Sequence, residues 1–172
     1  MENSELKQKI ADYLAENPNE HLRTLAEVFA VPEREIAAAY ALSVKVPVGD
    51  FAEVWNAAAA WEGAMFYVDH GDVIVEYSGK LPKGEIMFDG TMLNLEPGPF
   101  GGHVYLENLD AVYLIKKTLY GTESLSVMFY NTAGASMFGL FAGRDGRRKI
   151  IPSVRDSFEE LWQKYSVRGK LR

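Results

Sequence analysis

Two of the three histidines stand beside glycines, and they are the side chains best suited to hold a metal. His70 lies between Asp69 and Gly71, and His103 directly follows Gly102. A neutral imidazole binds borderline metals such as iron, and glycine lets the backbone come close to a flat ligand. These residues alone also allow roles without a metal. His70 would then be a turn residue, and His103 a hydrogen-bonded surface residue.

A basic cluster near the C-terminal end offers a second kind of chemistry. Arg144, Arg147, Arg148 and Lys149 lie close together in the chain. Guanidinium groups bind carboxylates through paired hydrogen bonds. Arg144 is therefore a candidate contact for an acidic group of a ligand, and a solvated loop is the alternative.

Several classes of chemistry are excluded by what the sequence lacks. The chain has no cysteine, which removes disulfides, thiolate metal sites and cysteine-held iron–sulfur clusters. It has no nucleophile elbow, P-loop, H-E-x-x-H motif or glycine-rich dinucleotide motif. The N-terminal residues lack an apolar signal core, and no apolar run reaches the roughly eighteen residues of a membrane span. We expect a cytoplasmic protein that makes no membrane contact.

Hydrophobic periodicity predicts five helices. Leu6, Ile10 and Tyr13 recur at helical spacing, and Asp50 with Glu53 resembles a capping box. The segment from residue 46 to residue 50 is expected to be a linker. The helices are expected at residues 4–16, 24–30, 32–42, 51–62 and 152–165.

The middle of the chain changes to a period of two, which predicts strands. Asp89-Gly90 predicts a two-residue hairpin. The other connections are also short, so the sheet should be mostly antiparallel. The strands are expected at residues 64–68, 73–77, 85–88, 91–95, 103–107, 111–118, 125–131 and 135–142.

This order of elements predicts an α+β fold. A helical segment at residues 1–45 should precede an α+β domain at residues 46–172, which has a large, mostly antiparallel sheet, a packed helix and a C-terminal helix. The three short helices of this segment, with a tight turn in the middle, resemble a helix-turn-helix unit. However, residues 1–43 hold four basic and eight acidic residues, a net charge of −4, and nucleic-acid binding needs cations. We therefore expect a packing or dimer-edge module and no nucleic acid.

Three segments carry a resemblance to a known family. They are DVIVEYSGKLPKG at residues 72–84, LNL at residues 93–95 and GGHVYLEN at residues 101–108. They resemble the HutX/HuvX-type cytosolic heme-utilisation carriers, which are related to one half of the HemS-type heme proteins. The resemblance covers roughly residues 51–165. It implies a homodimer that holds heme in a cleft on the sheet and passes it to a heme-degrading enzyme.

The resemblance also implies which residues contact heme. The GGH motif makes Gly102 and His103 candidates, with His103 as an iron ligand, and His70 falls where close relatives carry histidine. The two histidines would lie at opposite edges of one cleft, or one would come from each subunit. Met92 stands in a hairpin where several relatives carry histidine or tyrosine, and Arg144 is a candidate for the propionates. Two other functions stay open: a heme-degrading enzyme that needs an external reductant, and a non-heme interaction or regulatory module.

Overall fold

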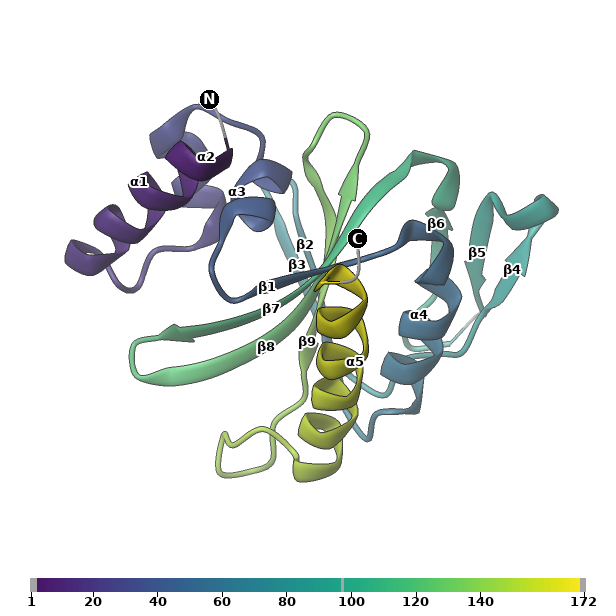
Figure 1. The fold of residues 1–172 in the computed structure, drawn as a ribbon. Helices are drawn as coiled ribbons and strands as arrows, with labels where there is room; N and C mark the ends of the chain where they lie inside the picture. Colours follow the sequence, from purple (N-terminus) through teal and green to yellow (C-terminus); the bar gives the residue numbers. More distant parts are fainter. Residues whose placement is uncertain (1–2, 97, 171–172) are drawn as a thin grey trace.

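A six-stranded antiparallel sheet forms the centre of the protein (Figure 1). The computed structural model describes residues 3–96 and 98–170. The large sheet has the order β1-β7-β8-β9-β2-β3, and β4, β5 and β6 form a separate three-stranded sheet. The helices are α1 (Asn3–Glu16), α2 (Leu22–Phe29), α3 (Glu33–Ala39), α4 (Phe51–Ala60) and α5 (Pro152–Lys170). The strands are β1 (Ser43–Val46), β2 (Ala64–Asp69), β3 (Ile74–Gly79), β4 (Glu85–Met87), β5 (Met92–Leu95), β6 (Gly102–Tyr105), β7 (Leu109–Leu119), β8 (Thr122–Asn131) and β9 (Ser136–Ala142).

The three N-terminal helices cover one face of the large sheet. Leu6, Ile10 and Leu25 are buried against Tyr113 and Met128, which point from β7 and β8 toward these helices. Successive strand residues point to opposite faces, so every second residue of β7 belongs to this layer. The apolar face of the N-terminal segment is therefore used in packing within the chain.

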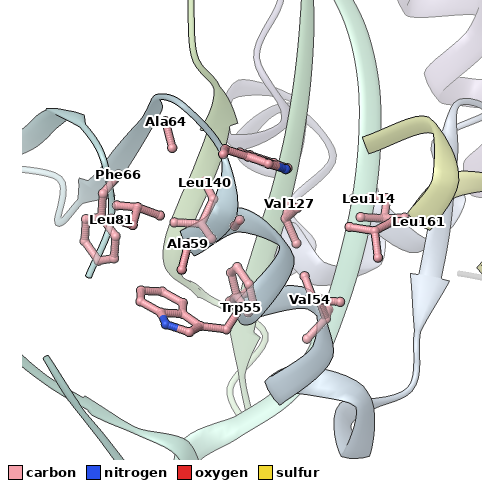
Figure 2. Close-up of a cluster of buried hydrophobic side chains, with 14 of the residues drawn as sticks. Val54, Trp55, Ala59, Ala64, Phe66, Leu81, Leu114, Val127, Leu140 and Leu161 are labelled. Atoms are coloured by element: carbon pink, nitrogen blue, oxygen red, sulfur yellow. The ribbon is translucent and has the colours of Figure 1, made fainter. Parts of the chain in front are cut away.

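The opposite face of the sheet packs against α4 and α5. Trp55 of α4 and Phe158 of α5 are fully buried there, with Leu114, Val127 and Leu140 of the sheet. Figure 2 shows Val54 and Trp55 of α4 directed at these strands. Because β7 and β8 are covered on both faces, their sequences are nearly continuous apolar runs.

The three-stranded sheet adds a further wall to this core. Leu93, Leu95 and Val104 point inward and are buried in the same cluster as Trp55, whose Nε1 donates to the Lys83 carbonyl at 2.8 Å. The β4–β5 hairpin extends away from the large sheet at the edge of the molecule (Figure 1). Its outer face carries the residues of one candidate site.

The expected α+β class is confirmed, and several local predictions are wrong. The strand β1 was not expected; it pairs with β7, with Val46 opposite Val112. The hairpin at Asp89-Gly90 is present, but Met87 pairs with Met92, so its loop has four residues instead of two. The single expected sheet is divided, because in the described part of the chain β4, β5 and β6 pair with one another and not with the large sheet.

The expected capping box at α4 is also wrong. The Asp50 side chain makes no capping hydrogen bond. It pairs instead with Arg168 of α5 at 2.8 Å, and Glu53 forms an ion pair with Lys164. These carboxylates therefore connect α4 to α5, a contact that spacing along one helix does not reveal.

Candidate functional site

His103 lies at an apolar pocket between the three-stranded sheet and the large sheet. The pocket has a volume of about 330 Å³. The His103 side chain is exposed, while the walls come from β2, β5, β9 and the segment before β6. Its apolar lining comprises Phe66, Val68, Leu95, Phe100, Val104, Met137 and Phe138. An exposed imidazole beside a largely apolar wall suits a flat ligand that carries a metal.

Stacked aromatic rings form one wall of this pocket. Phe100 lies 4.7 Å from Phe66 and 4.6 Å from Tyr77 between ring centroids. Phe66 stacks in turn on Phe138, at 5.1 Å with an interplanar angle of 12°. The ring contacts therefore lead from Tyr77 of β3 through Phe100 and Phe66 to Phe138 of β9. Sequence reasoning assigned these rings only to strands or a loop; period-two spacing signals a buried face but not which rings meet.

Gly102 leaves open space beside the imidazole. Its φ of +140° favours glycine, and apart from Gly102 and its two chain neighbours no protein atom lies within 4 Å of the place where a Cβ would be. A ligand can therefore approach the backbone at the start of β6 without meeting a side chain at this position. This geometry fits the role predicted for the glycine before His103.

Met92 lies on the same outer face of the three-stranded sheet as His103. His103 pairs with Asn94 of β5, and Tyr105 pairs with Met92, two residues away along each strand. Diagonal neighbours of this kind are roughly 7–8 Å apart, which is within reach of long side chains. Met92 is half-buried and Tyr105 is exposed. The structure thus brings two of the predicted site residues together.

His70 lies in a different pocket. It follows β2 in a turn whose backbone is closed by a hydrogen bond from the His70 amide to the Val73 carbonyl, at 3.0 Å. The exposed imidazole borders a pocket of about 690 Å³ that is lined by α2, α3 and the β8–β9 turn. Within one chain, the two histidines therefore do not share a cleft. A contribution from each of two subunits stays a prediction.

Arg144 is also separate from His103. Its Nη1 donates to the Arg148 carbonyl at 3.0 Å, and its Nη2 donates to the Glu123 carbonyl. The side chain borders a third pocket, of about 570 Å³, together with Glu62 and Ser78. Its guanidinium therefore holds the loop after β9 to the β7–β8 hairpin, and a propionate contact stays a prediction.

The helical face of the sheet holds polar groups that sequence reasoning missed. Arg23 of α2 forms an ion pair with Asp69, and the Tyr67 hydroxyl donates to Asp69 at 3.2 Å. Burial, together with the nearby Asp69 carboxylate, raises the pKa of Tyr67 to about 12. Tyr67 therefore stays a neutral hydrogen-bond donor at physiological pH.

Protein side chains alone do not build a metal centre in the described part of the chain. Over residues 3–96 and 98–170, no three or more histidine or carboxylate side chains are grouped to hold an ion. A single imidazole suits a metal whose other ligands come with it, as in a macrocycle. None of the described helices is long and apolar enough to cross a membrane.

Known proteins resemble this chain over most of its length. The intracellular heme transport protein HutX of Vibrio cholerae is 28% identical over 162 residues, covering 93% of this chain and 84% of HutX. A structure of the heme-binding protein ChuX has a TM-score of 0.80 and 29% identity, covering 91% of this chain and 96% of that one.

A more distant likeness concerns the fold alone. The heme-degrading enzyme ChuS of Escherichia coli O157:H7 is 15% identical, with a TM-score of 0.74, and the match covers 92% of this chain but 47% of ChuS.

The family model described as haem utilisation ChuX/HutX matches residues 44–161. This chain therefore belongs to the ChuX/HutX family of haem-utilisation proteins.

Proposed function

We propose that this protein is an intracellular heme carrier that binds heme at the His103 pocket. The observation that supports this most directly is the exposed His103 imidazole beside an apolar wall, next to a glycine with open space around it. The related HutX is named a heme transport protein and ChuX a heme-binding protein. Binding and release of heme, without ring chemistry, is the function that these features support.

In this proposal the chain contributes one iron ligand and an apolar surface. His103 binds the iron through a neutral imidazole, and Phe66 and Phe100 contact the macrocycle. Heme with its propionates exceeds a pocket of about 330 Å³, so part of the ring extends over the outer face toward Met92. An incompletely enclosed ligand is suited to transfer, and we propose that the receiver is a heme-degrading enzyme.

We also propose that the protein is a homodimer, with β3 near the contact. This strand forms one edge of the large sheet. Ile74 and Val75 at its start and Val73 just before it are 53–58% exposed. An apolar edge strand is a template for pairing with another chain. A second copy would bring a further His70 and Arg144 into the assembly. The heme contacts predicted for these two residues would then be made in a site shared between subunits.

A hemin titration followed by visible absorption tests the carrier proposal. We expect a saturable Soret shift in the unchanged protein and a weaker, blue-shifted band in His103→Ala. His70→Ala tests the partner contribution. His21→Ala is the matched control, because His21 is an exposed histidine that borders neither the His103 pocket nor the His70 pocket. Identical spectra in the His103 and His21 variants would show that His103 does not bind iron.

Transfer is tested separately with hemin-loaded protein and a heme-degrading enzyme lacking heme. The rate of heme transfer to the enzyme should exceed the rate of heme loss to a heme-scavenging apoglobin in a parallel reaction without the enzyme. Equal rates would mean that release into solution, and not direct transfer, limits the exchange.

A further inference from the structure

Another pocket, the helix–sheet pocket, lies between the N-terminal helices and the large sheet, and the proposed heme site at His103 does not use it. Its floor is formed by β2, β7, β8 and β9, and its roof by α2 and the start of α3. Met65, Tyr67 and Asp69 of β2 face it, whereas Phe66 and Val68 face the His103 pocket. The two pockets share no lining residue, because they occupy opposite faces of β2.

Lys117 is the unusual residue of the helix–sheet pocket. Only 8% of its surface is exposed, although it carries an ammonium group. No carboxylate oxygen of the described chain lies within ion-pair distance of it, and its Nζ lies 5.3 Å from the centroid of the Tyr40 ring. The neighbouring Lys116 points to the other face and pairs with Glu159 at 2.6 Å. Removing most of a lysine side chain from solvent without pairing its charge is unfavourable, so Lys117 is suited to an anionic ligand that enters this pocket.

The other charged groups of the pocket are already engaged. Asp69 pairs with Arg23, and Glu33 accepts a hydrogen bond from the Tyr130 hydroxyl at 3.2 Å. Burial lowers the pKa of Lys117, and the more distant Glu20 opposes this shift. The Tyr130 hydroxyl is neutral, so Glu33 keeps its negative charge at the α3 end of the pocket. At the β7–β8 end, Lys117 is the positive charge for which the described residues supply no ion pair.

We propose that this pocket binds a small monocarboxylate with an apolar body, and that Lys117 pairs with the carboxylate. Ile115, Met128 and Phe141 supply apolar contacts for the body of the ligand. Ser124 lies directly opposite Lys117 in the β7–β8 register and offers a hydroxyl to the same anion.

The volume of the pocket limits the ligand to about one six-membered ring. The pocket measures about 130 Å³, and an apolar cavity of about 150 Å³ accepts benzene in another protein. Heme is far too large for it. The ring of benzoate is of this size and its carboxylate supplies the charge, so benzoate is the probe for the test.

Fluorine NMR of 4-fluorobenzoate, with 4-fluorobenzyl alcohol as the neutral counterpart, tests the proposal. We expect saturable binding of the anion, and a loss of at least about tenfold in Lys117→Met, as for a charge-assisted hydrogen bond. The alcohol should bind the two proteins equally. Lys116→Met is the matched control, since its side chain points to the opposite face, and it should bind the anion like the unchanged protein.

A second variant keeps the test independent of Lys117. Ser124→Phe places a ring into the pocket, so it should abolish binding of both probes while circular dichroism shows an unchanged fold. Hemin titration should be unaffected in both pocket variants. The absence of saturable benzoate binding, or an unchanged affinity in Lys117→Met, would overturn the proposal and leave the heme proposal untouched.

Discussion

Asn94 of β5 pairs directly with His103 of β6, which places the imidazole on the outer face of the three-stranded sheet. The same register puts Met92 on that face, two residues along β5. His103 is thus held by a strand and not by a mobile loop. An iron ligand in this position has a defined direction before heme arrives.

Met92 is expected to contact the porphyrin without binding the iron. Met92→Leu keeps an apolar side chain of similar volume, so the Soret maximum should stay in place and hemin affinity should change less than about threefold, or roughly 0.6 kcal/mol. Met92→Lys, which adds a charge, should weaken binding more. A shifted Soret maximum in Met92→Leu would instead identify the thioether as an iron ligand.

Gly102→Ala is expected to weaken hemin binding and to destabilise the fold slightly. The new Cβ would occupy the space beside His103, and a φ of +140° is unfavourable for alanine. We expect a stability loss of about 1–2 kcal/mol, measured by urea unfolding, and a weaker Soret titration. Gly98→Ala is the control, since Gly98 also has open space but does not have a φ in this range. Equal hemin affinity in both variants would contradict the proposed approach at Gly102.

The β3 edge is expected to control the oligomeric state. Ile74 is 58% exposed on that edge, and a lysine there opposes pairing between edges. Ile74→Lys should convert dimers to monomers in sedimentation velocity. Val167→Lys on α5 replaces a side chain that is 59% exposed on a helix and not on the β3 edge, and this variant should remain dimeric. A dimer in both variants would exclude contact through β3.

Glu33 should make the protein less stable as pH rises above about 4. Burial raises its pKa, opposed by the Tyr130 hydrogen bond and by Arg23. The folded state therefore binds this proton more tightly than the unfolded state, whose glutamate pKa is about 4.3. The stability gained from proton binding is complete below that value and is lost as pH rises through the folded-state pKa.

Glu33→Gln isolates this effect because it keeps an oxygen that accepts from Tyr130. The variant should melt a few degrees higher at pH 7, a gain of roughly 1 kcal/mol, and should match the unchanged protein near pH 3. Tyr130→Phe leaves the carboxylate unpaired and should lower the melting temperature at pH 7. A pH-independent difference for Glu33→Gln would contradict this account.

Long periodic segments were predictable from the sequence, whereas short ones were not. β7 and β8 follow from their apolar runs, and α5 follows from helical spacing. β1 has only four residues, Ser43–Val46, next to Pro47; so short a segment carries too little periodicity to separate a strand from a linker. Its pairing with β7 depends on contacts between distant parts of the chain.

The candidate site was predictable only in part for the same reason. The GGH motif and the position of His103 at the start of a strand can be found in the sequence. The stacking of Phe66, Tyr77 and Phe100 depends on three segments meeting in space. The buried Lys117 was visible as a charge at the end of an apolar strand, but the absence of a carboxylate beside it depends on which elements pack there.

The strand order of the large sheet also sets an expected order of assembly during folding. The β7–β8–β9 meander is local in the chain, whereas β9 meets β2 and β7 meets β1 only after long loops close. Such closures cost chain entropy and slow folding. We expect Val127→Ala on β8 to slow refolding, and Val46→Ala on β1 mainly to speed unfolding, in stopped-flow fluorescence. The reverse pattern would place β1 in the folding nucleus. In the expected order, the N-terminal helices complete the helix–sheet pocket only after its floor has formed from the strands.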